Sequence, residues 1–316
     1  MTNDRSATPE SLGIDPARLE ALFERARREV DAGILPSCQL AVARHGKLAA
    51  VRALGRARFG GGASPGAGAE RDVDPSTLYV IFSCTKAITS AAGWLLLQEG
   101  KLGLDERVAD VLPGFEANGK GAVTVEQLFT HTAGFPSAPS GPQDWASSAA
   151  MRARFARWRL NWEPGSRFEY HPSSSMWVIA ALIEERSGVS FRDFVRARIA
   201  EPLGLPDLFV GTPAAQCGRV ADIVHSGTAL TAEDFRARGW PVPPETEVTE
   251  EAVERFNRDD VRAVGVPGGG ATTNAASLAL FYQALLDGRT PDGNALWAPE
   301  TLALARSVRT GDLVDP

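Results

Sequence analysis

Residues 80–97 read VIFSCTKAITSAAGWLLL and join a polar reactive pair to a long apolar segment. The apolar run 80–82 is typical of a strand, and residues 87–97 are typical of a buried helix. Ser83 is therefore expected in the first turn of that helix, where free N–H groups and the helix dipole favour a developing negative charge. Lys86 follows three residues later, on the same face, and can reach the Ser83 hydroxyl. Burial of a lysine favours its neutral form, which can accept a proton.

The four letters S-x-x-K also fit a serine that caps a helix and a solvated lysine. Two later segments distinguish these interpretations: residues 128–136 read LFTHTAGFP, and residues 163–170 read EPGSRFEY with Ser173 shortly after. The first resembles the LLTHTSG signature of serine β-lactamases, penicillin-binding proteins and family VIII esterases. The second resembles the PGxxFxYS segment that carries their catalytic tyrosine. On these three segments, in the family's order, the chain is identified as a member of this superfamily, most similar to the class C β-lactamase-like family VIII carboxylesterases.

The resemblance implies an α/β fold of the β-lactamase/transpeptidase type, in which helices flank an antiparallel sheet and an all-α domain is inserted. We expect residues 1–88 and 261–316 to form the α/β domain and residues 89–260 to form a mostly helical domain. Residues 206–260 are polar and proline-rich, so we expect an irregular excursion there that overhangs the site. In the family three C-terminal strands complete the sheet, and we expect them to be missing from a chain that stops at Pro316.

Local patterns predict several elements independently of the resemblance. Asp15-Pro16 predicts the start of a helix that ends near Gly33. Residues 38–43 and 48–54 read as two strands joined in a hairpin at His45-Gly46. Further helices are predicted at residues 124–129, 150–157, 175–186, 191–199 and 278–286.

The resemblance implies that Ser83 attacks an ester or amide carbonyl to form an acyl-enzyme that water then hydrolyses. Lys86 and Tyr170 are the candidate proton-transfer partners, and which of them is the base stays open. The Ser83 backbone N–H would supply one arm of an oxyanion hole. Residues 266–272, VPGGGAT, resemble the family's GGLxST segment, which makes Gly268, Gly269 and Gly270 candidate substrate-binding residues; the alternative is a tight turn before the next helix.

Two departures from the family pattern affect the expected substrate. The Tyr-x-Asn of class C β-lactamases and peptidases is Tyr170-His171-Pro172 here, which favours esters over lactams or peptides. The third motif, Lys-Thr-Gly or His-x-Gly, has two partial matches, at residues 309–311 and 225–227, and neither has the expected place in the chain. A G-x-S-x-G match at residues 62–66 lies in a Gly/Ala/Pro loop without the strand and helix that a nucleophile elbow needs.

Composition excludes several classes of function. The 316 residues are 44% hydrophobic and 23% charged with a net charge of −6, which argues against nucleic acid as a partner. No signal peptide or membrane-spanning run is evident, so a cytoplasmic protein without a membrane partner is expected. Three separated cysteines and four scattered histidines form neither a disulfide framework nor a metal pattern, and Cys84 is expected to pack against the core.

We therefore predict a serine hydrolase that cleaves small-molecule esters without a metal or organic cofactor. The alternative enzyme is a β-lactamase or D-Ala-D-Ala-type peptidase. The alternative of another class is a non-catalytic member of the fold that binds or scaffolds, which the expected loss of C-terminal strands would favour. The sequence does not indicate the oligomeric state.

Overall fold

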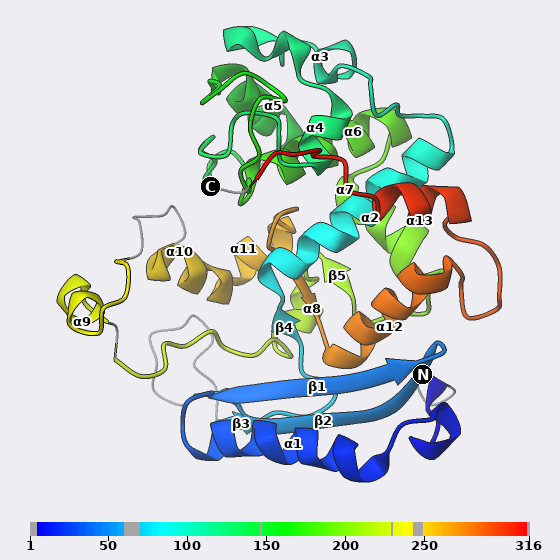
Figure 1. Cartoon of the computed structure of the whole chain (residues 1–316), viewed down its shortest axis with the longest axis vertical. Coiled ribbons are helices and arrows are strands. Elements are labelled where there is room, and N and C mark those ends of the chain that lie inside the picture. The colour runs from blue at the N-terminus through cyan, green and yellow to red at the C-terminus, as the bar shows by residue number, and fades with distance from the viewer. Residues whose placement is uncertain (1–4, 60–69, 146, 229, 243–248, 315–316) are drawn as a thin grey trace.

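The computed structural model describes residues 5–59, 70–145, 147–228, 230–242 and 249–314. A strand layer covered by helix α1 (Pro16–Asp31) lies at one end of the molecule, and a mostly helical part lies at the other (Figure 1). Helix α12 (Ala275–Asp287) packs on β1 from the opposite side, so it joins the strand layer to the helical part. Among the described residues, no helix combines the length and the apolar character that crossing a bilayer requires.

The N-terminal hairpin follows its sequence prediction. Strand β1 (Ser37–Arg44) pairs antiparallel with β2 (Lys47–Arg58), and β2 pairs with the short β3 (Arg71–Asp72). The turn residues His45 and Gly46 have φ of 53° and 72°, the left-handed values that a two-residue hairpin turn needs. Asp15 caps α1 by accepting hydrogen bonds from the backbone N–H groups of Ala17 and Arg18, which confirms the predicted helix start.

A second, smaller sheet brings together distant parts of the chain. Its strand order is β4 (Tyr79–Val80), β6 (Ala271–Thr273) and β5 (Phe209–Val210), all antiparallel. The residues just before Ser83 therefore lie beside the residues just after the glycine turn at 266–270. The sheet places these two candidate segments next to each other.

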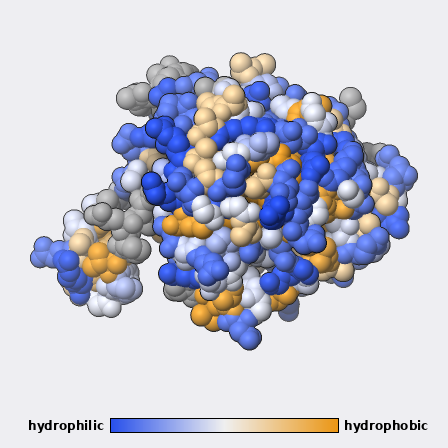
Figure 2. All heavy atoms as spheres, turned by 90° about the horizontal axis from the view of Figure 1, so that it is seen from above, coloured by the Kyte–Doolittle hydropathy of each residue, from blue (hydrophilic) through white to orange (hydrophobic). Residues whose placement is uncertain are grey.

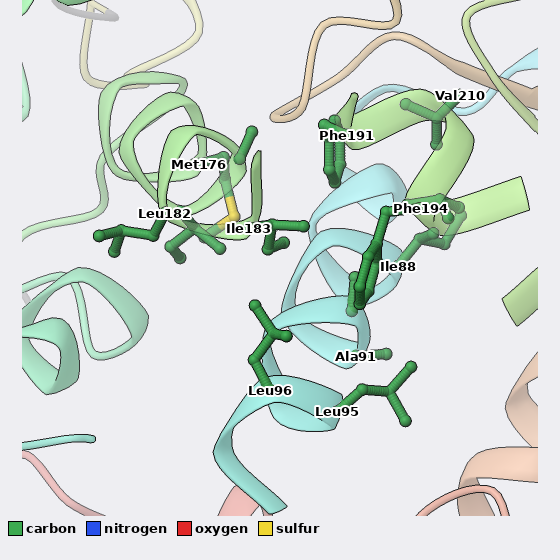
Figure 3. Close-up of a cluster of buried hydrophobic side chains, with 14 of the residues drawn as sticks. Ile88, Ala91, Leu95, Leu96, Met176, Leu182, Ile183, Phe191, Phe194 and Val210 are labelled. Carbon is green, nitrogen blue, oxygen red and sulfur yellow. The ribbon is translucent and has the colours of Figure 1, made fainter. Parts of the chain in front are cut away.

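The helical core is built around α2 (Thr85–Gln98), which packs against α6 (Ser174–Ser187) and α7 (Phe191–Val195). Figure 3 shows Ile88, Leu95 and Leu96 of α2 among side chains of α6 and α7. Each of these three residues is fully buried, and burial of such a side chain stabilises the fold by about 1.5–3 kcal/mol. Because α2 is held so firmly, the residues of its first turn have a rigid support.

The predicted helices are all present, with one change of type: α7 ends at Val195 and continues as a π-helix to Ala200. Residues 206–260, expected to be irregular, contain only short elements in their described part. Figure 2 shows the region of helix α9 (Ala232–Ala237) as a small lobe that stands away from the rest of the molecule. The G-x-S-x-G match at residues 62–66 lies outside the described residues. The remaining elements are η2 (Glu10–Leu12), η3 (Phe82–Cys84), α3 (Val108–Val111), η4 (Ala117–Ala122), α4 (Val125–Phe129), α5 (Ser148–Arg157), η5 (Arg196–Ala200), α8 (Ala214–Cys217), α9 (Ala232–Ala237), α10 (Glu250–Glu254), η6 (Arg255–Asn257), α11 (Asp259–Val264) and α13 (Pro299–Ala305).

Candidate active site

Ser83 lies in a sharp turn between strand β4 and helix α2. The Ile81 N–H still bonds to the Ala271 carbonyl, 3.0 Å away, and the chain then turns at Phe82, whose φ is 42°. A left-handed conformation of a bulky residue costs about 1–2 kcal/mol, and here the Phe82 ring packs edge-on against Phe256 at 5.7 Å. The turn leaves the Ser83 side chain exposed at the start of the helix.

Cys84 corrects the sequence prediction. It was expected to pack against the core, but it is exposed. The reason is that η3 (Phe82–Cys84) is a 3₁₀ turn, which orients its residues differently from an α-helix in the same register. A free thiol therefore lies on the surface next to the candidate nucleophile.

Lys86 is buried, with 9% of its surface exposed, and three acceptors surround its Nζ. Nζ lies 3.2 Å from Ser83 Oγ, 2.7 Å from the Pro172 carbonyl oxygen and 2.8 Å from the Gly268 carbonyl oxygen. An ammonium group has three protons, and this arrangement gives each of them an acceptor. The expected approach of Lys86 to Ser83 is present, and it is accompanied by two carbonyl contacts that side-chain patterns do not indicate.

Tyr170 reaches Ser83 from an irregular segment just before α6. Its hydroxyl donates a hydrogen bond of 2.9 Å to Ser83 Oγ, and its ring centroid lies 4.9 Å from Lys86 Nζ. Tyr170 is 41% exposed, and Ser83 is also exposed, so the pair lies at the surface of the protein. The three predicted catalytic residues therefore meet within hydrogen-bonding distance, although Tyr170 is 87 residues from Ser83.

Two histidines for which no catalytic role was predicted hold the Tyr170 segment. The His171 backbone N–H donates to His131 Nδ1 at 3.1 Å, and the His131 ring lies against the Tyr170 ring with centroids 5.0 Å apart. The His171 side chain is fully buried; its Nδ1 lies 2.6 Å from the Glu169 carbonyl oxygen, and its Nε2 accepts from the Phe135 N–H at 3.2 Å. The LFTHTAGFP segment was the available signal for His131.

Burial keeps both histidines neutral near pH 7. It lowers the pKa of His131 from 6.5 to about 4, with smaller contributions from nearby His171 and Lys86. Burial also lowers the pKa of His171 to about 4, against the opposing effect of its hydrogen bond to Glu169. Neutral rings retain a nitrogen lone pair, which both hydrogen bonds from backbone N–H groups require.

The glycine turn at residues 266–270 forms the wall of the site behind Lys86. The turn is fixed to α2 by two threonines: Thr89 Oγ1 donates to the Pro267 carbonyl at 2.7 Å, and Thr85 Oγ1 accepts from the Ala271 N–H at 3.0 Å. A Cβ on Gly268 would lie 3.7 Å from Lys86 Nζ. These threonines, at the second and sixth positions after Ser83, were not identified from the sequence.

The other two predicted glycines differ in position. A Cβ on Gly269 would lie 3.8 Å from the Phe82 backbone, next to Ser83. A Cβ on Gly270 would lie 2.5 Å from the Val266 nitrogen, and the Gly270 N–H donates to the Val266 carbonyl at 2.7 Å. Gly268 and Gly269 thus adjoin the reactive side chains, whereas Gly270 closes the turn.

The two partial matches to the third motif have other partners. Arg309 forms an ion pair with Glu126 on α4, and His225 lies 3.4 Å from Glu250 on the surface. Within the part of the chain that the structure describes, neither Arg309 nor His225 bonds to Ser83, Lys86 or Tyr170. That neither segment is the third motif stays a prediction.

The described geometry can be compared with that of known proteins. A family model described as Beta-lactamase matches residues 22–313. The chain belongs to this family. The resemblance inferred from the sequence and the predicted β-lactamase/transpeptidase-like fold are therefore confirmed.

Several members of the Beta-lactamase family are similar to this chain. Esterase EstB from Burkholderia gladioli is 31% identical over 246 residues, which are 70% of this chain and 59% of EstB. A protein named "Putative D-alanyl-D-alanine carboxypeptidase" from Escherichia coli (strain K12) is 28% identical over 215 residues, 63% of this chain and 48% of that protein. The chain thus spans about half to three fifths of the length of these curated relatives.

Two solved structures show the same fold. A penicillin-binding protein homolog from Caulobacter crescentus has a TM-score of 0.72 and 29% identity, covering 92% of this chain and 76% of its own. A family VIII carboxylesterase has a TM-score of 0.69 and 25% identity, covering 89% of this chain and 73% of its own. The family thus includes proteins named for ester and for peptide chemistry.

Proposed function

We propose that the chain is a serine hydrolase that cleaves small esters through an acyl-enzyme on Ser83. The observation that supports this most directly is the meeting of Ser83 Oγ with two proton-transfer groups, at 2.9 Å and 3.2 Å. Ser83 Oγ would bond to the ester carbonyl carbon as it loses its proton. The alcohol would then leave with a proton, and water would release the acid in a second, equivalent step.

Tyr170 is the better candidate for the group that takes the Ser83 proton. Lys86 Nζ lies within hydrogen-bonding distance of three acceptors, so its place in the site suits a hydrogen-bond donor. Tyr170 is 41% exposed, and its hydroxyl contacts Ser83 Oγ directly. To take the Ser83 proton it would act as a phenolate, whose negative charge Lys86 beside its ring would balance. Lys86 would supply positive charge beside the reacting oxygens, and the Ser83 N–H would bind the developing oxyanion.

Esters are favoured as substrates by the residue two positions after Tyr170. Where the family's Tyr-x-Asn would offer an amide side chain to the substrate, Pro172 offers no donor, and its carbonyl is already bonded to Lys86. EstB and the family VIII carboxylesterase are named for ester hydrolysis. We propose that the reaction needs no cofactor, because nucleophile and proton-transfer groups are all side chains.

Hydrolysis of p-nitrophenyl butyrate and of nitrocefin by the chain and by Ser83→Ala tests the proposal. Ser90→Ala, on the same helix two turns later, is the matched control. Ester turnover that disappears in Ser83→Ala and persists in Ser90→Ala supports the esterase. Nitrocefin turnover of similar efficiency would favour the β-lactamase.

The carboxypeptidase relatives make a D-Ala-D-Ala dipeptide substrate the third assay. Mass spectrometry after reaction with a fluorophosphonate adds a single-turnover test, because it reports whether Ser83 is nucleophilic without requiring deacylation. Failure of Ser83 to react with fluorophosphonate, ester, lactam and peptide would contradict the enzyme and support the binding or scaffolding alternative.

A further inference from the structure

We propose that His131 is a positioning residue that holds Tyr170 against Ser83 by binding the backbone on both sides of it. This inference rests on the proposed function, because it assigns His131 a role in the work of Tyr170. Among the described residues, His131 makes hydrogen-bond and ring contacts with residues 169–171 and none with Ser83. Its effect would therefore pass through Tyr170.

Three contacts of His131 bracket Tyr170. The His131 carbonyl accepts from the Glu169 N–H at 3.3 Å, on one side of Tyr170. Its Nδ1 accepts from the His171 N–H at 3.1 Å, on the other side. Its ring packs on the Tyr170 ring, with centroids 5.0 Å apart and planes tilted by 45°. Together these contacts fix the backbone direction and the ring position of a residue that regular secondary structure does not support.

The backbone of His131 indicates that this position is under constraint. Its φ is 58°, a left-handed conformation that is uncommon for residues other than glycine, although Asn, Asp and His tolerate it best. Such conformations persist where the surrounding contacts determine them, and they concentrate at functional sites. The backbone carbonyl and the ring Nδ1 of His131 both accept hydrogen bonds from the short segment 169–171.

The tautomer of His131 follows from the same contacts. Because Nδ1 accepts a hydrogen bond, the ring proton of the neutral form is on Nε2. Protonation of Nδ1 would place one donor against another and add a positive charge near Lys86. The low pKa of His131, about 4, keeps the acceptor available across the neutral range.

His171 extends the support without touching Ser83. Its side chain bonds back to the Glu169 carbonyl and to the Phe135 N–H. The Phe135 carbonyl in turn accepts from Ser174 Oγ at the start of α6. The two histidines thus connect residues 131–135 to residues 169–174, and of the two His131 is the one whose ring lies against the Tyr170 ring.

A matched pair of substitutions separates the hydrogen bond from the backbone strain. Asn and Gly both tolerate the left-handed conformation of His131, but only Asn offers an acceptor near the position of Nδ1. With p-nitrophenyl butyrate we expect His131→Gly to lower kcat by about 10–100-fold with KM within about twofold, as misplacement of a reacting group does. His131→Asn should keep kcat within about fivefold of the parent. Equal kcat values for the Asn and Gly variants would overturn the proposal.

Two further variants exclude a merely structural effect. Leu128→Ala, in the core of α4, should lower the unfolding temperature without changing kcat per folded molecule. His225→Gly, at an exposed histidine, should change neither. If kcat fell as much in Leu128→Ala as in His131→Gly, the rate would depend on the general stability of this region and not on the contacts between His131 and the Tyr170 segment.

A readout that does not require turnover keeps the inference distinct from the proposed function. NMR of ¹³C-labelled tyrosine, with Tyr170→Phe to assign the signal, reports the surroundings of Tyr170 among three tyrosines. We expect the Tyr170 resonance to shift in His131→Gly and to return toward the parent position in His131→Asn. An unmoved resonance in His131→Gly would overturn the positioning role. Absence of Ser83-dependent hydrolysis together with the expected resonance shifts would refute the esterase while supporting the role of His131.

Discussion

The Nζ atom of Lys86 lies 2.8 Å from the carbonyl oxygen of Gly268, a residue 182 positions later in the chain. The same atom lies 2.7 Å from the Pro172 carbonyl, so one buried ammonium group connects helix α2, the glycine turn and the segment that carries Tyr170. Lys86 therefore stabilises the arrangement of the site as well as contributing charge to it. Tyr170 is half exposed, and its hydroxyl bonds to Ser83 and to no other residue in the described part of the chain, so it has no such structural role.

This difference predicts that Lys86 and Tyr170 respond differently to removal. Lys86→Met should lower kcat by about 10²–10⁴-fold and should also lower the free energy of unfolding, since each buried carbonyl left without a donor costs about 1–3 kcal/mol. Tyr170→Phe should lower kcat over a similar range and leave the free energy of unfolding within about 1 kcal/mol of the parent. Urea unfolding beside ester hydrolysis measures both quantities. A stable Lys86→Met or a strongly destabilised Tyr170→Phe would contradict this assignment.

The sequence predicted those parts of the fold and site that depend on side-chain identity at short spacing. Asp15 before Pro16 marked the start of α1, the His45-Gly46 turn marked the hairpin, and the i, i+3 spacing placed Lys86 beside Ser83. Each of these depends on local backbone geometry that a few residues determine.

What the sequence did not reveal depends on backbone groups and on distant contacts. Every residue except proline has both a backbone N–H and a carbonyl. The amino-acid sequence therefore does not distinguish the Gly268 carbonyl from any other as the partner of Lys86. The roles of His131 and His171 required residues 40 positions apart to meet. Cys84 was expected in the core because a free cysteine is usually buried, whereas its 3₁₀ turn leaves it exposed.

The three glycines of the turn should respond differently to replacement by alanine. Gly270→Ala should lower the free energy of unfolding by about 1–3 kcal/mol, because its Cβ would lie 2.5 Å from the Val266 nitrogen. Gly268→Ala should lower kcat about tenfold through misplaced Lys86 contacts, since its Cβ would lie 3.1 Å from the Pro172 carbonyl oxygen.

Gly269→Ala is the matched control for the stability of both variants. Its Cβ would make only ordinary contacts of 3.8 Å with Phe82, so the free energy of unfolding should stay near that of the parent. Thermal unfolding of the three variants measures their relative stability, and steady-state kinetics measures the loss of kcat in Gly268→Ala. Unfolding of Gly269→Ala at a lower temperature than Gly270→Ala would contradict this prediction.

The stability of the fold should decrease as pH falls from 7 to 5. In the unfolded chain His131 and His171 bind protons near pH 6.5, whereas in the folded chain their pKa values are about 4. The unfolded state therefore binds more protons over this interval, and each histidine lowers the free energy of unfolding by about 2 kcal/mol between pH 7 and pH 5. Urea unfolding at several pH values measures the loss.

His131→Asn provides the internal test of that loss. Removal of one of the two histidines with a lowered pKa should reduce the loss between pH 7 and pH 5 by about half, because His171 alone then contributes. His225→Asn, at an exposed histidine, should leave the loss as it is in the parent. The same pH dependence in His131→Asn and in the parent would show that His131 does not carry it.

The exposed thiol of Cys84 gives a chemical test of which residue is the nucleophile. Cys84 adjoins Ser83 on the surface, whereas Cys38 is half buried and Cys217 is buried, so a maleimide should react first at Cys84. A bulky adduct there should block ester hydrolysis by steric exclusion. Cys84→Ala should hydrolyse the ester as the parent does and resist inhibition by maleimide, because the attacking atom is Ser83 Oγ. Peptide mapping identifies the modified cysteine, and a kinetic assay measures ester hydrolysis before and after modification. Loss of activity in Cys84→Ala would indicate that the thiol of Cys84, and not Ser83 Oγ, is the nucleophile.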